Sequence, residues 1–291
     1  MADNHDFAME RRLRRLDPEL HKRFTDAVFA LQYNLSNYKL IFPEYTDHSN
    51  LHSMTVIDFC NRLIGSRIDR LNADALYVLL MGCYFHDTGM GITMKDYEAF
   101  SREIDFGNYF DTHDRDNLPA TIRDFHNEFS GLFIRKYAEL FEIPSEAHLW
   151  AIIQISRGHR KTDLMDEAEY PIALKMPDGN AVCLPYLSAL IRLADEIDVA
   201  AARNPILLYD IEALTDEVEI IENKKVNAVR SLEVSDDAFT LFVDASDADI
   251  LARVRRMAAK MLRTLEDCRA AVLDRTPYVI TQERIIVNEI V

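Results

Sequence analysis

The chain has 291 residues and a formal net charge of -16, from 33 lysines and arginines against 49 aspartates and glutamates. This length predicts one or two domains and excludes a miniprotein that needs staples to fold. Hydrophobic residues make up 48% of the chain, and no segment approaches about 18 uncharged apolar residues, so we expect no membrane association. The negative charge disfavours nucleic acid as a partner, and a polyanion would need a local cationic patch or a metal.

The N-terminal segment and the cysteines both favour a cytoplasmic protein. Residues 1–17 place charges on both sides of a very short apolar stretch, so we expect no signal peptide. The four cysteines show no C-x-x-C spacing and should be reduced, buried thiols. They are Cys60, Cys83, Cys183 and Cys268. Gly89 and Gly91 form the only pair at G-x-G spacing, which excludes a dinucleotide or P-loop fingerprint.

A helical period dominates the chain from residue 17 to residue 203 and predicts a mainly α protein. The apolar residues recur at spacings of three and four, for example at Leu76, Leu79, Leu80 and Cys83. We therefore expect a helical domain over residues 1–205. Residues 91–119 are polar, aromatic and weakly periodic, which is typical of a long insertion that forms a lid.

A small α+β appendage is expected over residues 206–291, after a break at Asn204 and Pro205. Three runs look like strands, with turns at residues 223–224 and 236–237. These runs are residues 218–222, 228–235 and 239–246, followed by a helix over 247–274 and a final strand over 278–291. The apolar final strand should have a paired edge, and we expect a homo-oligomer. The appendage shows no constellation that could perform chemistry.

Four expected helices carry a metal-ligating residue type on an apolar face. The residues are His52, His86 followed by Asp87, His126, and Asp195. A single buried histidine is usually a hydrogen-bonded core residue, and a single aspartate can pair with an arginine, as Asp195 could with Arg192 or Arg203. An isolated buried carboxylate is costly, however, and five such residues in one domain together predict a shared divalent metal site.

Three motifs resemble the HD superfamily of metal-dependent phosphohydrolases. They are H-S-x-x-V from His52, F-H-D-T-G from Phe85, and L-I-R-L-A-D-E-I-D from Leu190. The resemblance extends over about residues 40 to 205 and implies a helical HD bundle. YTDHSNLHS and HDTGMG are similar to HD domains found beside chaperone-type ATPase modules. The resemblance further implies that the first metal is bound by His52, His86, Asp87 and Asp195.

Members of the superfamily with two metals imply a second pair of ligands, for which His126 and His159 are the candidates. Histidine and aspartate ligands without a thiolate suit Mn, Fe, Co, Ni, Zn or Mg, and a two-metal site would favour Fe or Mn. We therefore expect one or two divalent ions per chain. Met90 stands where many phosphodiesterase members have lysine. HDTGMGIT also lacks the second histidine and the proline of the deoxynucleotide triphosphohydrolases, which disfavours that subgroup.

Several other polar residues are candidates for binding the substrate. Arg157, Arg160 and Lys161 form the best anion-binding cluster of this acidic chain, although they could equally form a solvated turn. His48 should line the pocket or orient a ligand. Asp87 should orient the attacking water, which makes it a catalytic residue together with the basic cluster. Asp198 could support a ligand or pair with Arg203, whereas His5, His21, His113 and His148 are expected at the surface.

Hydrolysis of a phosphoester or phosphoanhydride by metal-activated water is the chemistry that fits these residues best. The expected substrate is a small phosphate compound, and a nucleotide is favoured. One alternative is an HD-type nuclease that cleaves single strands, against which the net charge argues. Another alternative is a non-catalytic regulatory module that senses a nucleotide in the pocket and assembles through its C-terminal strands.

Overall fold

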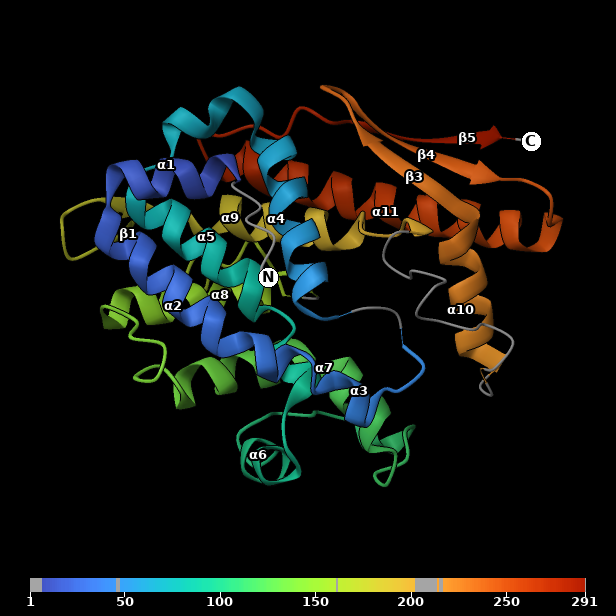
Figure 1. Ribbon diagram of the computed structural model, residues 1–291, viewed down its shortest axis with the longest axis horizontal. Helices are drawn as coiled ribbons and strands as arrows, with labels where there is room; N and C mark the ends of the chain where they lie inside the picture. Colours follow the sequence, from blue (N-terminus) through green and yellow to red (C-terminus); the bar gives the residue numbers. More distant parts are fainter. Residues whose placement is uncertain (1–6, 46–47, 161, 202–213, 215–216, 291) are drawn as a thin grey trace.

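The computed structural model describes residues 7–45, 48–160, 162–201, 214 and 217–290. These residues form a mainly α structure with a small sheet near the C-terminus, as predicted (Figure 1). The α-helices are α1 (Ala8–Leu16), α2 (Pro18–Leu35), α3 (Tyr38–Ile41), α4 (Asn50–Ile64), α5 (Ala73–Phe85), α6 (Met94–Phe100), α7 (Leu118–Lys136), α8 (Glu146–Gly158), α9 (Leu184–Glu196), α10 (Glu217–Ala228) and α11 (Ala248–Arg275). Three short 3₁₀ helices are η1 (Gly65–Arg70), η2 (Thr88–Gly91) and η3 (Tyr109–Asp111), and the strands are β1 (Leu174–Lys175), β2 (Ala181–Val182), β3 (Val229–Val234), β4 (Ala238–Asp244) and β5 (Arg284–Ile290).

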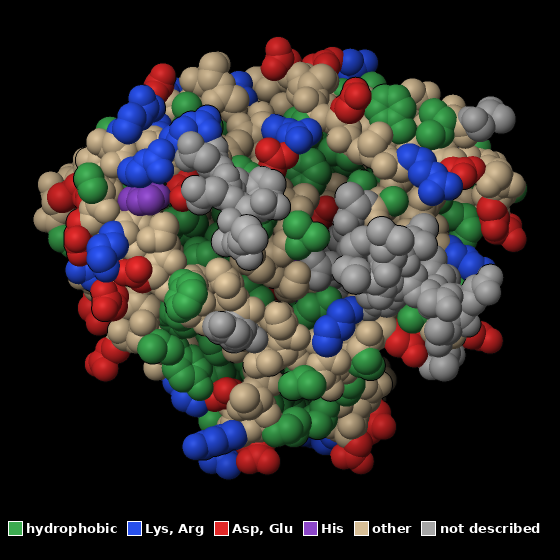
Figure 2. Space-filling view, viewed as in Figure 1, with side chains coloured by type: hydrophobic (Ala, Val, Ile, Leu, Met, Phe, Trp, Pro, Cys, Tyr) green, Lys and Arg blue, Asp and Glu red, His purple; other side chains and the backbone are tan. Residues whose placement is uncertain are grey.

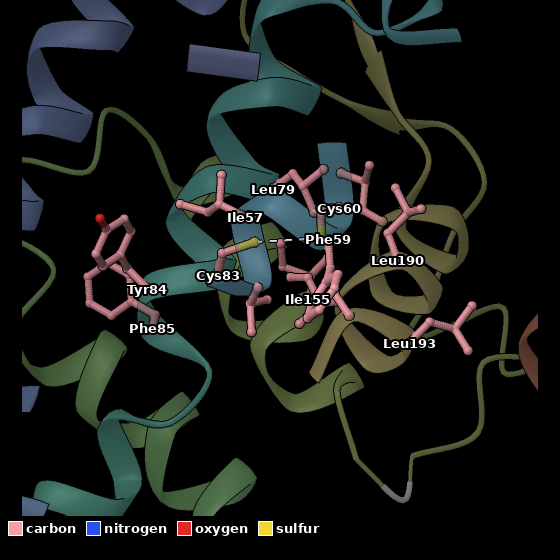
Figure 3. Packing of buried hydrophobic residues seen from close by; sticks show 14 of the residues in the cluster. Ile57, Phe59, Cys60, Leu79, Cys83, Tyr84, Phe85, Ile155, Leu190 and Leu193 are labelled. Atoms are coloured by element: carbon pink, nitrogen blue, oxygen red, sulfur yellow. Dashed lines mark hydrogen bonds between the residues drawn. The ribbon is translucent and has the colours of Figure 1, made fainter. Parts of the chain in front are cut away.

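The centre of the core is α5, whose apolar sequence is buried on all sides. It packs against α1, α2, α4, α8 and α9. Figure 3 shows side chains of α4, α8 and α9 beside those of α5. Gly82 permits this close packing, because a Cβ atom there would lie 2.4 Å from Cδ1 of Ile155 on α8. Cys60 and Cys83 meet in the same core with their sulfurs 3.9 Å apart, and all four cysteines are buried and free, as predicted.

Local sequence signals begin the helices that carry the candidate site. The Ser49 hydroxyl accepts a hydrogen bond from the backbone N–H of Leu51 and caps α4. Asn117 and Ser145 cap α7 and α8 in the same way. Pro185 occupies the first turn of α9, where its missing N–H costs no helical hydrogen bond. These signals fix where each helix starts and therefore which residues face inward.

The C-terminal sheet has the strand order β3-β4-β5. β3 and β4 form an antiparallel hairpin around the predicted turn at residues 236–237, and β5 lies parallel to β4 (Figure 1). The long helix α11 packs on α9 and on β5, and its Val254 and Met261 belong to the same core as the helical bundle. The predicted strands 228–235 and 239–246 and the predicted helix 247–274 are thus confirmed, and the inner edge of the final strand pairs within the chain.

The prediction of a strand over residues 218–222 was wrong, because this run lies inside α10. The isoleucines of the run favour strands, but its tertiary contacts select a helix. Asn223, placed in a turn by the sequence, is buried, and its side-chain amide donates to the carbonyl of Glu219 one helical turn earlier. The break at residues 204–205 lies outside the described residues.

The prediction that His148 lies at the surface was also wrong, because this residue is buried. Its Nε2 lies 2.8 Å from Oδ1 of Asp74, and Asn180 donates to the other carboxylate oxygen. Burial alone would raise the pKa of Asp74, but the hydrogen bonds from His148 and Asn180 lower it overall. His21 is half-buried beside Glu10, and His5 lies outside the described residues.

Charged side chains of both signs are interspersed over the face seen in Figure 2, with apolar side chains between them. Among the described helices, none has the length and apolar character needed to cross a bilayer.

Candidate metal centre

The first cluster of ligand atoms surrounds one oxygen of Asp87, just beyond the end of α5. Oδ2 of Asp87 lies 3.4 Å from Nε2 of His52 and 3.4 Å from Nε2 of His86. Oδ1 of Asp195 lies 3.2 Å from the same His52 nitrogen and 3.9 Å from that of His86. His48 Nδ1 is 2.9 Å from Oδ2 of Asp87. The structure thus brings together the four residues predicted for the first metal.

The second cluster surrounds the other oxygen of Asp87. Oδ1 lies 3.3 Å from Nε2 of His126 on α7 and 3.7 Å from Nε2 of His159 at the end of α8. The two histidine nitrogens are 2.8 Å apart. Asp87 therefore lies between two histidine pairs, with one carboxylate oxygen directed at each. Asp87 could therefore supply one oxygen to a metal held by each histidine pair.

Four imidazole rings in these clusters are oriented by a hydrogen-bond acceptor at Nδ1. The acceptors are the carbonyls of Cys83, Arg123 and Ser156 for His86, His126 and His159, and the carboxylate of Asp198 for His52, at 2.5 to 2.9 Å. A carbonyl or carboxylate only accepts, so each neutral ring carries its proton on Nδ1 and directs the lone pair of Nε2 inward.

The inward orientation of the Nε2 lone pairs shows that the donor set fits a metal ion. The Nε2 atoms of His52 and His86 are 3.2 Å apart, and those of His126 and His159 are closer still. Two facing lone pairs repel each other unless a cation lies between them. Neutral imidazole and ionised carboxylate are also the ligands that divalent transition metals favour. The donor set thus fits metal ions, and three groups of these side chains could each hold one: His48, His52 and Asp87; His52, His86 and Asp195; and Asp87, His126 and His159.

The electrostatics of the clusters keep their ligands in the form that binds metal. Burial alone would raise the pKa of Asp87, but the surrounding imidazoles of His86, His126, His48 and His52 hold it well below its usual range. The pKa of Asp195 is likewise lowered by His52 against the effect of burial. Burial and the neighbouring imidazoles hold the pKa of His159 well below its ordinary value. Near neutral pH both carboxyls are therefore ionised and His159 is uncharged.

A close contact between η2 and α7 fixes the distance between the two clusters. The hydroxyl of Ser130 accepts from the backbone N–H of Gly89 and donates to the carbonyl of His86. A Cβ atom at Gly89 would lie 2.1 Å from the carbonyl oxygen of His126, so only glycine permits this approach. The glycine that follows the His-Asp pair therefore has a structural role beside the site.

The two clusters lie at the floor of a pocket of about 580 Å³. Asp87, His126 and Asp195 line the floor, and Met90 stands beside them. α10 and α11 supply much of the wall, so the C-terminal appendage lines the pocket, although the three candidate ligand groups contain none of its residues. The basic residues that line the pocket are Arg123, Arg160, Lys225, Arg253, Arg256, Lys260 and Arg263.

The residues of the predicted anion-binding cluster do not lie together in the structure. Arg160 lines the pocket, and its guanidinium lies 3.5 Å from Nδ1 of His126. Arg157 lines a neighbouring pocket instead, where Glu128 and Glu169 bind its guanidinium. Lys161 lies outside the described residues. The geometry therefore supports a role in substrate binding for Arg160 and places Arg157 in a structural ion-pair network.

The structure also decides between the alternatives for the nearby acidic residues. Asp198 is buried and accepts from His52 Nδ1, so it supports a candidate ligand. Arg192 donates to the carbonyls of Gly158 and Thr162 rather than to Asp195. Arg203, the other possible partner, lies outside the described residues. Among the described residues, Asp195 therefore lies against His52 rather than against Arg192.

The segment predicted as a lid, residues 91–119, contains the short helices α6 and η3. None of the described residues 91–119 lines the pocket above the clusters. Several of them line the neighbouring pocket instead, among them Glu103 and Tyr109. His113 is exposed, as predicted, and stacks on the ring of Tyr109 with a centroid distance of 4.0 Å.

Sequence reasoning missed the basic residues of α11. Their spacing of three, four and three residues places Arg253, Arg256, Lys260 and Arg263 on one helical face, which was the available signal. The apolar residues of the same helix give a periodic signal of their own, which indicates burial of that face but not what the opposite face meets. Arg123 was also missed, since nothing local indicates that α7 presents it to the pocket.

The HD-CE family model matches residues 42–274. This match includes all six predicted metal ligands and the part of α11 that lines the pocket. Neither a curated protein nor a solved structure matches the chain at a significant level.

Proposed function

This chain belongs to the HD-CE family, and we propose that it is a metal-dependent hydrolase of phosphoester or phosphoanhydride bonds in a nucleotide. The observation that carries the proposal is Asp87, which directs one oxygen at each of two histidine pairs on the floor of a pocket lined by seven basic side chains. Divalent ions in such a site lower the pKa of bound water and stabilise the charge that develops on a phosphoryl group.

The residues of the pocket can divide the remaining tasks. Asp87 stays ionised and accepts a hydrogen bond from His48 Nδ1, which orients the carboxylate at the floor of the pocket. Asp198 holds the ring of His52 with Nε2 directed inward. Arg123 and Arg160 lie where they can donate to phosphoryl oxygens. These roles require a substrate whose reacting phosphate reaches the floor of the pocket.

The proposal is tested by measuring phosphate and nucleoside release from a panel of nucleoside mono-, di- and triphosphates. Protein purified without chelator is assayed as isolated and after loading with Mn, Fe, Co, Ni, Zn or Mg. Turnover of at least one nucleotide, abolished by a chelator and restored by metal, is the expected result. Faster cleavage of labelled single-stranded DNA or RNA would favour the nuclease. Tight nucleotide binding without turnover in any metal would favour the regulatory module.

We also propose that the chain forms a homodimer through β5. β5 lies at the edge of the sheet, and Ile286 and Ile290 are 37% and 38% exposed. An edge strand with exposed isoleucines is a template for pairing with a second copy. Light scattering at micromolar concentration should give the mass of a dimer, and Ile286→Lys should give a monomer. A monomeric wild-type protein would contradict this proposal.

A further inference from the structure

One face of α11 presents a row of basic side chains to the pocket above the metal clusters. We call this row the α11 stripe; it consists of Arg253, Arg256, Lys260 and Arg263. All four side chains are exposed, and all four line the pocket that contains Asp87 and Asp195. The stripe and the clusters therefore face the same space.

Over the residues that the structure describes, most side chains of the stripe lack the ion pairs that other arginines of the same helix form. Outside the pocket, Arg255 pairs with Glu289 and Arg269 pairs with Glu283. Within the described part of the chain, Arg253, Arg256 and Arg263 form no ion pair with a carboxylate, although acidic residues outnumber basic ones. Like charges at helical spacings of three and four repel each other, so this row costs stability unless an anion binds to it.

Lys260 connects the stripe to the metal centre. Its ammonium lies 3.0 Å from Glu196, which directly follows Asp195 at the end of α9. The packing of α11 on α9 places the helix beside the floor of the pocket, and this ion pair joins the two helices there. A ligand whose reacting phosphate reaches Asp87 and Asp195 therefore has the stripe alongside the rest of its length.

The length of the stripe indicates what that ligand carries. The ten helical steps from Arg253 to Arg263 rise about 15 Å, so successive charges lie about 5 Å apart along the axis. One phosphate can contact two neighbouring side chains at most, whereas a chain of linked phosphates can engage more of the row. The pocket volume of about 580 Å³ lies in the range of small-molecule sites. A long nucleic acid is disfavoured, because a pocket of this volume holds a ligand of small-molecule size.

We infer that the α11 stripe binds the non-reacting phosphates of the ligand, and that this ligand is a nucleotide with a chain of two or more phosphates. The inference rests on the proposed function for the reaction at the floor of the pocket. The binding itself can be measured without turnover, so the two can fail separately.

The test compares tripolyphosphate with orthophosphate, because these probes report on the phosphate chain without assuming a base. Affinities are measured by calorimetry for the full chain, the variant Arg256→Gln/Arg263→Gln and the control Arg255→Gln/Arg269→Gln, which loses the same charge outside the pocket. Wild type and control should bind tripolyphosphate at least about tenfold more tightly than orthophosphate. The stripe variant should lose most of this preference. Non-hydrolysable analogues of ATP and GTP, compared with AMP and GMP, should show the same pattern for at least one base.

Three results would overturn the inference: equal binding of tripolyphosphate and orthophosphate by wild type, equal losses in the stripe variant and the control, or a larger loss for single-stranded DNA than for the nucleotide. Matching thermal unfolding of the two variants shows that both are folded. If nucleotides are turned over but the stripe variant behaves as the control does, this inference fails while the proposed function stands. If binding depends on the stripe and no metal supports turnover, the proposed function fails instead.

Discussion

Asp87→Ala is expected to remove both metal ions and to lower hydrolysis by at least about a hundredfold, the scale on which loss of one charge-stabilising group acts. The reason is the position of this carboxylate, whose two oxygens face different histidine pairs. Its removal leaves each pair without the anion that balances the charge of a cation. Elemental analysis of protein purified without chelator gives the metal content directly.

The matched control is Asp74→Ala. Asp74 is also a buried aspartate that accepts from a histidine, but it lies outside the residues that line the pocket. Losing it leaves His148 without its buried partner and should cost about 1–3 kcal/mol of stability. The metal content should nevertheless remain that of wild type. Full metal occupancy in Asp87→Ala, or an equal loss in the control, would contradict the assignment of Asp87.

His126→Ala should lose one metal and keep the other. Wild-type protein loaded with Mn or Fe should bind about two ions per chain, and this variant about one, because the cluster of His52, His86 and Asp195 does not use His126. His52→Ala should show the reciprocal loss. Metal titration followed by elemental analysis measures both.

A suitable control for these variants is His148→Ala, which removes a buried imidazole that faces Asp74 rather than Asp87. It should retain both ions. A wild-type chain that saturates at one ion under Mn or Fe loading would rule out the two-metal arrangement. Loss of both ions in His126→Ala would show that the clusters do not bind independently.

The site could be predicted from the sequence where a ligand lies on a strongly apolar segment. His86 and Asp87 end a helix that is apolar on all sides, and His126 shares a face with Phe129. His159 follows a helix but begins a polar segment, so only the resemblance to HD domains indicated it. Its burial depends on α7 and α5, which are distant in sequence.

The remaining features depend on partners that no local pattern reveals. Arg157 and Arg160 are three residues apart, yet one turns to Glu128 and the other to the pocket. α10 was mistaken for a strand because isoleucines favour strands unless a tertiary contact, such as that of the Asn223 amide with the carbonyl of Glu44, selects the helix. The position of the α11 charges beside the clusters results from the packing of α11 on α9, which the sequence of α11 alone does not indicate.

The candidate ligands lie on α4, α7 and α9 and just beyond the C-terminal ends of α5 and α8. They are therefore spread along nearly the whole helical bundle. Ions that bind them would act as cross-links between helices far apart in sequence. A ligand that binds only the folded chain stabilises it by about 2.7 kcal/mol at a hundred times its dissociation constant. Metal supply would then set the resistance of this protein to heat and proteolysis, independently of any reaction that it catalyses.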